Sequence, residues 1–409
     1  MRVALVIALA HRPTHDTRVF TSWAHLLLTY GSHGLYAHVD TVDHYPVNYP
    51  PGYALLLGAV TTVFGRLGTH GSDAVLGSLL KIPAVVADLA LCGVVYAVAR
   101  RWVDARQALV APILAAFAPF TWPISAMWGQ VDSICATFMV SAFALCVSRR
   151  YTFAWLALAC AVLVKPLPIV LVPLLAGAQI RERGFSLRSL AGPLAGIALA
   201  YFAALPFAPT AAPAQTFRWL AQQYASGQSL TDATSVNAYN VWTLVGGPVR
   251  DGTLLFGITL HTWGWLAVGI LTGAATIALG KRMILTASNS VVREQAVLRA
   301  WFVVLDGTFM FSTRMHERYV LFALALTPLL WYCGRLERAV AVVTVATFVT
   351  CVVVVVGLYE HHVTREIAAI PHLLAFVNLL AFAAMVLTLF RTPAASRAER
   401  QSASRKSPK

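Results

Sequence analysis

The chain carries its ionisable and hydrogen-bonding residues in a few dense clusters between long apolar runs. The densest cluster is residues 314–318, where four ionisable side chains fall within five positions. A carboxylate can accept a proton from a reacting hydroxyl group, and arginine or lysine can bind an anion such as a phosphate. The clusters therefore contain the residue types needed for acid–base chemistry on an anionic substrate.

Four further clusters contain residues of the same types. Polar groups that interrupt membrane-depth apolar segments are energetically expensive, and they mark candidate functional residues for that reason. The four clusters are residues 15–18 with Asp16 and the aromatic run 48–53 that follows, the pair Lys81 and Asp88, residues 128–133 with Gln130 and Asp132, and Lys165 before Pro166.

Most of these clusters also have a purely structural interpretation. Asp16 and Arg18 can form a solvated pair, Lys81 and Asp88 a buried ion pair, Asp132 can cap the next helix, and Lys165 can extend to lipid head groups. A later trio, Asn237, Asn240 and Trp242, fits either sugar contact or turn formation. The run 314–318 is the hardest to explain in this way, because four ionisable groups exceed what membrane anchoring needs.

The elements that must position these residues are transmembrane helices. Of the 409 residues, 58% are hydrophobic and 12% are charged, whereas a soluble domain is about half apolar and a quarter charged. Apolar blocks of about 15 to 24 residues suit helices that cross a hydrocarbon core of roughly 30 Å. This composition excludes a water-soluble enzyme, a disordered protein and a nucleic-acid-binding module. The net charge of +14 is explained by arginines at the block ends, which are retained on the cytoplasmic side.

The block pattern predicts an all-α integral membrane domain of about twelve transmembrane helices over residues 1–390. When every arginine-containing break is placed in the cytoplasm, the breaks alternate correctly, and the outer face receives two long loops, 11–75 and 207–256. The apolar block 52–65 disturbs the alternation if it spans, so we expect a re-entrant or juxtamembrane helix there. The basic tail 391–409 is expected to be disordered and cytoplasmic.

The first apolar run, residues 3–10, is too short to cross a membrane. We expect it to be the outer half of a first helix whose upstream part is missing from this chain. A weak signal sequence that ends at residues 8–10 is the alternative.

The order of the motifs resembles the prokaryotic relatives of the second mannosyltransferase of GPI-anchor assembly, which are multispan glycosyltransferases of the GT-C fold. The resemblance extends from residue 15 to residue 319, and its more specific motifs are WGQxDS and RMHERY. The motifs are the aspartate of the first outer loop, Tyr-Pro-Pro-Gly-Tyr at 49–53, Lys81 with Pro83 and Asp88, WGQxDS at 128–133, Lys165-Pro166, NxxNxW at 237–242 and RMHERY at 314–319.

The resemblance implies an enzyme that takes a sugar from a polyprenyl-phosphate carrier at the outer face of the plasma membrane. The sugar, with mannose favoured, passes with inversion to a glycan or glycolipid acceptor. The resemblance also implies Asp16 as the catalytic carboxylate and Asp132 as the second acidic residue of the class. Such a protein has the membrane lipid and the two substrates as partners and no nucleic acid.

The chemistry of this transfer assigns roles to the candidate residues. A general base contributes typically ~10²–10⁴-fold to the rate, and cations stabilise the charge that develops on the departing phosphate. We expect Asp16 to be the base and Lys165, Arg314 and Arg318 to bind the donor phosphate. The residues expected to orient substrates are Asp132, His316, Glu317, Gln130 and Arg18, and those expected to contact sugar or lipid are Trp128, Tyr49, Tyr53, Asn237, Asn240 and Trp242.

The histidines lack metal-ligand spacing with any carboxylate, so we expect no metal site and no cofactor besides the lipid-linked donor, although the dependence on a divalent metal stays open. Two alternatives to an active transferase also remain open. One is a non-catalytic lipid or sugar transporter or flippase, which would need an inner-facing site that the short basic cytoplasmic loops do not supply. The other is an inactive family member that serves as an accessory subunit.

Overall fold

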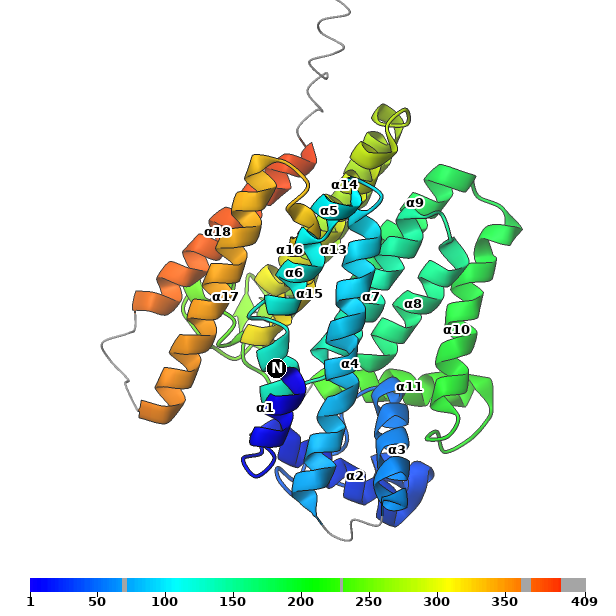
Figure 1. Ribbon diagram of the computed structural model, residues 1–409, viewed down its shortest axis with the longest axis vertical. Coiled ribbons are helices and arrows are strands. Elements are labelled where there is room, and N and C mark those ends of the chain that lie inside the picture. The colour runs from blue at the N-terminus through cyan, green and yellow to red at the C-terminus, as the bar shows by residue number, and fades with distance from the viewer. Residues whose placement is uncertain (68–71, 229–230, 362–368, 391–409) are drawn as a thin grey trace, which may run out of the picture.

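The chain forms a bundle of helices, one end of which is covered by further helices (Figure 1). The computed structural model describes residues 1–67, 72–228, 231–361 and 369–390. Within them, five helical segments are long and apolar enough to cross a membrane, so the chain is an integral membrane protein. These are α4 (Asp73–Ala99), Leu187–Ala204 with α10 (Ala191–Ala204), α13 (Leu260–Leu285), Arg335–Val354 of α17 (Arg335–His361), and α18 (Ala369–Phe390).

The expected number of about twelve spanning helices is not confirmed. Several apolar blocks are divided, because proline has no backbone N–H to donate and interrupts a helix. Block 318–333 becomes η5 (Glu317–Val320), α15 (Leu321–Leu324) and α16 (Thr327–Leu330), and block 166–180 becomes η3 (Leu167–Leu171) followed by α9 (Val172–Arg183). The remaining helices of the bundle are α5 (Ala105–Ala108), α6 (Val110–Phe117), α7 (Asp132–Val147), α8 (Tyr151–Val164) and α14 (Ser290–Phe311).

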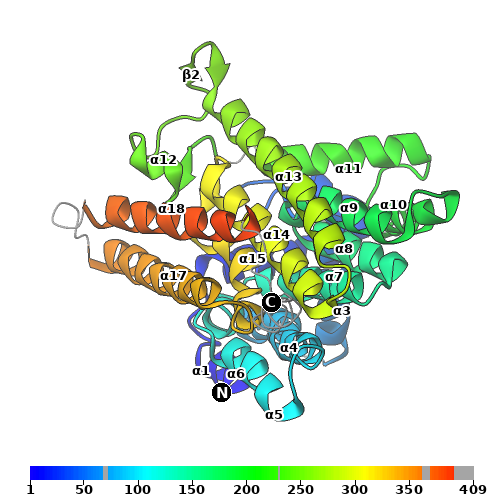
Figure 2. The same ribbon diagram turned by 90° about the horizontal axis from the view of Figure 1, so that it is seen from above.

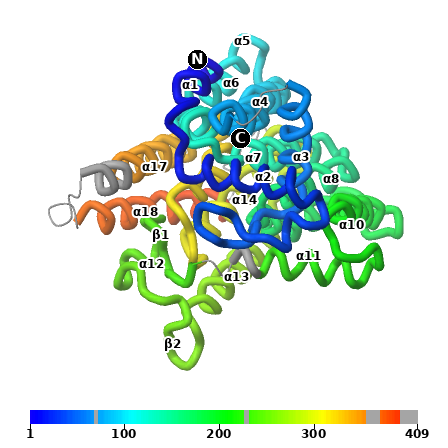
Figure 3. Tube along the Cα trace, turned by 90° about the horizontal axis from the view of Figure 1, so that it is seen from below, coloured from blue at the N-terminus to red at the C-terminus, as the bar shows by residue number. Residues whose placement is uncertain are grey.

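The two segments expected as long outer loops lie at one end of the bundle, and both contain helices. The first contains α2 (His15–Gly34), η1 (Leu35–Ala37) and α3 (Pro51–Arg66) after a short α1 (Arg2–Ala8), so it holds two long helices rather than the single expected one. The second contains α11 (Pro213–Gln228), and α2 and α11 both lie across the ends of the long helices (Figures 1 and 3). The tail 391–409 lies outside the described residues.

Short strands complete the second outer segment. The parallel pair of β1 (Ser235–Val236) and β4 (Met315–His316) joins this segment to residues 314–319. Between them in sequence lie α12 (Val241–Leu244) and the hairpin of β2 (Leu254–Leu255) and β3 (Ile258–Thr259), which projects beyond the start of α13 (Figure 2). The strand pair thus fixes residues 314–316 against a chain segment about eighty positions earlier.

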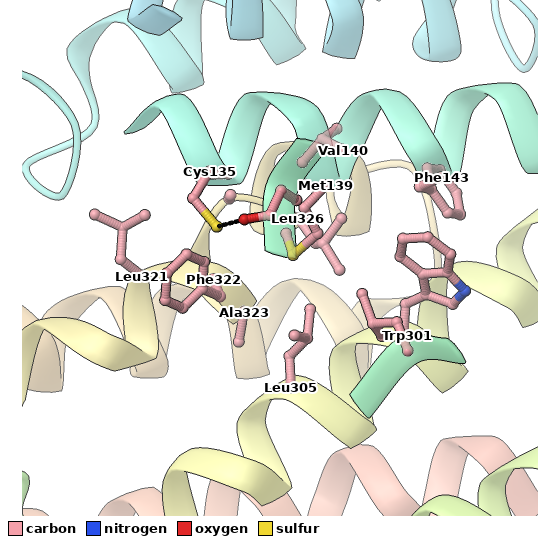
Figure 4. Packing of buried hydrophobic residues seen from close by; sticks show 14 of the residues in the cluster. Cys135, Met139, Val140, Phe143, Trp301, Leu305, Leu321, Phe322, Ala323 and Leu326 are labelled. Atoms are coloured by element: carbon pink, nitrogen blue, oxygen red, sulfur yellow. Dashed lines mark hydrogen bonds between the residues drawn. The ribbon is translucent and has the colours of Figure 1, made fainter. Parts of the chain in front are cut away.

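The centre of the bundle is a dry contact between α7, α14 and the broken helix 317–330 (Figure 4). Phe143 and Trp301 meet edge to face, with ring centroids 5.6 Å apart, an arrangement that aromatic quadrupoles favour. Because this core is packed solidly, it fixes the start of α7 and the end of α14, the two places where polar clusters begin. Its labelled members in Figure 4 are Cys135, Met139, Val140, Phe143, Trp301, Leu305, Leu321, Phe322, Ala323 and Leu326.

A glycine on α3 allows that helix to pack directly on α8. A Cβ atom at Gly52 would lie 2.6 Å from the carbonyl oxygen of Leu163, whereas one at Gly58 would have its closest neighbour 3.7 Å away.

We predict that Gly52→Ala lowers the free energy of unfolding by about 1–3 kcal/mol through overpacking, and that the control Gly58→Ala does not. Thermal unfolding in detergent measures both, and equal midpoints would contradict the close contact.

Candidate active site

Asp16 lies in the first turn of α2, where the helix dipole favours a negative charge. Thr14 caps this helix by accepting a hydrogen bond from the Thr17 backbone N–H (3.2 Å), and its hydroxyl donates to the carbonyl oxygen of Trp128 (2.6 Å). The Asp16 carboxylate accepts hydrogen bonds from Trp128 Nε1 and from Gln130 Nε2 (2.6 Å). Both bonds end on the same oxygen, Oδ2.

The turn that places Trp128 and Gln130 beside Asp16 depends on Gly129. This residue has φ +84°, and a Cβ atom there would lie 2.7 Å from Thr17 Oγ1. Glycine adopts the left-handed conformation without steric cost. The turn can therefore close against α2, and the residues on either side of Gly129 both reach Asp16.

Asp16 is held in its ionised form. Burial raises the pKa of Asp16, but the positive charge of Arg318, the hydrogen bonds from Gln130 and Trp128, and the charge of Lys165 outweigh it and hold the pKa below its usual value. The Arg318 guanidinium lies 5.6 Å from the ring centroids of both Trp128 and Tyr319. Aromatic faces stabilise a cation in this position, so a positive charge is kept close to the Asp16 carboxylate.

The oppositely charged side chains of Lys165 and Asp132 form a pair close to Asp16 and Arg318. Lys165 follows the end of α8 in an extended conformation, and its Nζ donates to Asp132 Oδ1 (2.6 Å) at the start of α7. Burial lowers the pKa of Lys165, but Asp132 and the nearby tyrosines reverse the shift, so the ammonium group stays charged. The second oxygen of Asp132 is buried and has no hydrogen-bond partner among the described residues.

Gln130 connects the two charged groups. Its Oε1 accepts a hydrogen bond from the Tyr49 hydroxyl (3.0 Å) and a longer one from Lys165 Nζ (3.5 Å). Since Lys165 has only donors, the amide oxygen must face it, and the amide NH₂ must face Asp16. The orientation of the Gln130 side chain is thereby fixed by its surroundings.

Aromatic residues form one wall of this region. The rings of Phe20, Trp23, Tyr49 and Tyr53 pack together, with centroids between 5.1 and 6.2 Å apart. The Tyr53 hydroxyl is buried without a hydrogen-bond partner in the described part of the chain. Only Tyr49 of this group makes a polar contact with Gln130.

His316 and Glu317 lie near these charges in different states. Burial lowers the pKa of His316 to about 3, with Arg318 and Lys165 adding to the effect and Asp16 opposing it. His316 is therefore neutral, and its ring packs edge to face against the ring of Tyr319, with centroids 5.3 Å apart. Burial raises the pKa of Glu317, and Arg318, which donates to its Oε1 (3.4 Å), opposes that shift only in part.

A pocket opens beside Lys165 with about 870 Å³ of empty space including its mouth. Its apolar lining includes Leu167, Ile169, Trp265 and Phe322. Its polar lining residues are Asn48, Tyr49, Lys165, Tyr224, Thr308 and Tyr319. A pocket lined by one lysine and several apolar side chains suits an amphipathic ligand better than a free sugar. Asp16 does not line this pocket; Gln130 and Tyr49 lie between the two.

Arg314 is placed away from Asp16 and is occupied by a carboxylate. Its Nε lies 2.6 Å from Asp251 Oδ2, and Asp251 also accepts a hydrogen bond from Thr313 (3.0 Å) and lies 3.2 Å from His261 Nδ1. Asp251 is a single acidic residue in a polar segment, and no sequence signal distinguishes it. The Arg314–Asp251 pair attaches the second outer segment to residues 313–316.

The trio of the second outer segment makes structural contacts. Asn240 Nδ2 donates to the carbonyl oxygen of Phe309 (3.0 Å), and Trp242 Nε1 donates to that of Phe311 (2.8 Å). These bonds satisfy carbonyl groups in the last turn of α14 that have no partner within the helix. Asn237 adopts φ +58°, and its carbonyl oxygen accepts a weak bond from Cys351 Sγ (3.3 Å).

The other sequence candidates are not brought to Asp16. Arg18 is exposed on α2. Lys81 and Asp88 share a helix face but do not pair, because Lys81 donates to the carbonyl oxygen of Met127 (3.1 Å) and Asp88 pairs with Arg2 (2.8 Å). No group of three or more His, Cys, Asp or Glu side chains in the described ranges is arranged to hold a metal ion.

No protein-family model matches the chain, and no curated protein sequence matches it. Among solved structures, the chain is similar to the archaeal oligosaccharyltransferase AglB from Archaeoglobus fulgidus, in complex with an inhibitory peptide and a dolichol-phosphate. The sequence identity is 13% and the TM-score 0.43, over 98% of this chain and 56% of that one. The chain thus spans little more than half the length of AglB, and a likeness at this level assigns neither family nor activity.

We predict that His316 makes stability depend on pH on the acid side. The unfolded chain binds a proton at this residue near pH 6.5, and the folded chain binds it only near pH 3. Between these values protonation favours the unfolded state, so this contribution to stability decreases as the pH falls. Replacing His316 with Gln should flatten the dependence of the thermal midpoint on pH in this window, and an unchanged slope would contradict a neutral imidazole at this half-buried position.

Proposed function

We propose that the protein is an inverting glycosyltransferase that moves a sugar from a polyprenyl-phosphate carrier to a glycan or glycolipid acceptor. The observation that supports this proposal is an ionised Asp16 that Trp128 and Gln130 hold in place. Arg318 adjoins it, and a pocket nearby is lined by Lys165 and by apolar side chains. The motif order described above supports mannose as the sugar and the extracytoplasmic face of the plasma membrane as the place of reaction.

Asp16 is the general base in this proposal. The acceptor hydroxyl attacks the anomeric carbon, its proton passes to Asp16, and the bond from the anomeric carbon to the phosphate oxygen breaks with its electron pair on the phosphate. Since both hydrogen bonds to the carboxylate end on Oδ2, Oδ1 has no hydrogen-bond partner in the described structure and is free to accept the proton. A half-buried carboxylate that stays ionised is suited to this task.

Lys165 and Arg318 stabilise the departing phosphate. Lys165 lines the pocket, where it presents a point charge, and Arg318 provides a planar group that binds phosphate through two parallel bonds. The apolar residues Leu167, Ile169, Trp265 and Phe322 suit the polyprenyl chain. Because Arg314 is already paired with Asp251, we assign it to holding residues 313–316 in place instead of binding the donor.

We predict that Asp16→Asn lowers sugar transfer by ~10²–10⁴-fold, because the amide cannot accept the proton. The measurement is transfer of radiolabelled sugar from a panel of synthetic polyprenyl-phosphate sugars in membranes that contain equal amounts of inserted protein. Asp43→Asn is the matched control, because the one polar contact of the Asp43 side chain among the described residues is with the exposed His15 (3.0 Å). Full activity of the Asp16 variant would refute the assignment, and no transfer with any donor would favour the transporter or accessory interpretation.

A second prediction concerns the pH dependence of transfer. Arg318→Gln removes the positive charge that does most to lower the pKa of Asp16, so the carboxylate should become protonated at a higher pH. The acid limb of the pH–rate profile is therefore expected to move upward, together with a fall in the maximal rate. Arg12→Gln, which removes an exposed charge near Asp16 in sequence, should leave the limb in place; equal profiles for Arg318→Gln and wild type would contradict the coupling.

A further inference from the structure

A shallow groove lies at the start of α17, on the side of the molecule opposite α2 and α3. It is lined by Trp331, Arg335, Arg338, Ala339, Val342 and Val343. This end of α17 lies at the same end of the bundle as α5 and the α13–α14 hairpin (Figure 1). The groove shares no residue with the candidate active site.

The two arginines of the groove have no acidic partner in the part of the chain that the structure describes. The intervening carboxylate, Glu337, is 6% exposed and turns inward to pair with Arg299 Nε (2.7 Å). Gly334 leaves room for this inward turn, since a Cβ atom there would lie 2.3 Å from Glu337 Oε2. The outward surface therefore keeps two positive charges that nothing on the same turn compensates.

The groove combines this charge with aromatic and aliphatic surface. The Arg338 guanidinium lies 5.8 Å from the ring centroid of Trp331, a stacking contact that leaves the N–H edge of the guanidinium free to donate. Arg335, Arg338 and Val342 follow each other at spacings of three and four residues, so they lie on one helix face. Trp331 is 38% exposed and Val342 57% exposed.

The position of the groove in the membrane follows from the helix that carries it. Residues Arg335–Val354 form one of the segments apolar enough to cross a bilayer. The first turn of such a helix lies at the level of the lipid head groups, and Val342, about two turns further on, lies at the level of the acyl chains. The arginines thus face phosphate groups, and the aliphatic residues face hydrocarbon.

We propose that this groove binds an anionic phospholipid, with its phosphate between Arg335 and Arg338 and its acyl chain along Ala339, Val342 and Val343. A lipid fits better than a free phosphate, because the apolar residues of the groove follow the two arginines along α17 toward the hydrocarbon core. Binding at this site is independent of the proposed transfer reaction. It uses the charge attraction that basic residues near a membrane surface exert on acidic lipids.

Native mass spectrometry of the full chain in nonionic detergent, titrated with phosphatidylglycerol, tests the proposal. The double variant R335Q/R338Q should bind phosphatidylglycerol about 25-fold more weakly, at about fivefold for each arginine near a membrane surface. Binding of phosphatidylcholine should be weak and unchanged. The matched control, R12Q/R218Q, removes the same charge from two exposed arginines that lie outside the span-length segments and should bind phosphatidylglycerol as wild type does.

Three results would overturn the proposal. Equal loss in the two double variants would show a general effect of net charge, and equal binding of both lipids would show that the arginines do not recognise the head group. Competition by soluble glycerol phosphate as strong as that by the lipid would show a free-anion site. Should the double variant fail to fold, Trp331→Leu keeps both charges and removes the stacking surface; several-fold weaker binding supports the groove, and unchanged binding rejects it.

Discussion

The arrangement of the candidate site depends on a single amide side chain, that of Gln130. Its oxygen receives Tyr49 and Lys165, and its nitrogen donates to Asp16. Four separate segments of the chain therefore meet at one residue. Charged groups that are removed from water need partners, and Gln130 supplies one to a carboxylate and to an ammonium group at the same time. Gly129 is the backbone counterpart, since only its conformation brings Gln130 to α2.

The second outer segment serves mainly as a support for residues 312–319. Asn240 and Trp242 hold the last carbonyl groups of α14, β1 pairs with β4, and Asp251 holds Arg314. The next residues, His316 to Arg318, carry the groups that adjoin Asp16. The second outer segment, which the sequence suggested as a sugar contact, thus holds in place the motif that contains Arg318.

The mostly helical, membrane-spanning character of the chain could be predicted from the sequence, because membrane insertion imposes strong rules on hydropathy. The number of spans could not. Hydrogen bonds connect Asp16, Gln130 and Lys165, and Arg318 adjoins Asp16. The side of the membrane that these residues face stays a prediction from the arginine-rich breaks. Helix continuity could not be predicted in the same way, since hydropathy does not register where a proline divides a block. The interaction partners of charged residues could not be predicted either. Lys81 and Asp88 have the spacing of an ion pair, yet each contacts a different segment. Asp251 has no sequence pattern around it that would indicate its contact with Arg314.

The buried pair of Lys165 and Asp132 also bears on how a ligand would enter and leave the pocket. An incoming phosphate has to compete with Asp132 for the same ammonium group, and the second oxygen of Asp132 has no other partner to turn to among the described residues. The affinity for a phosphate is then a difference between two strong interactions, and it is smaller than either alone. In the proposed reaction, return of Lys165 to Asp132 after sugar transfer would help to release the lipid phosphate, and the internal pair would in this way limit product inhibition.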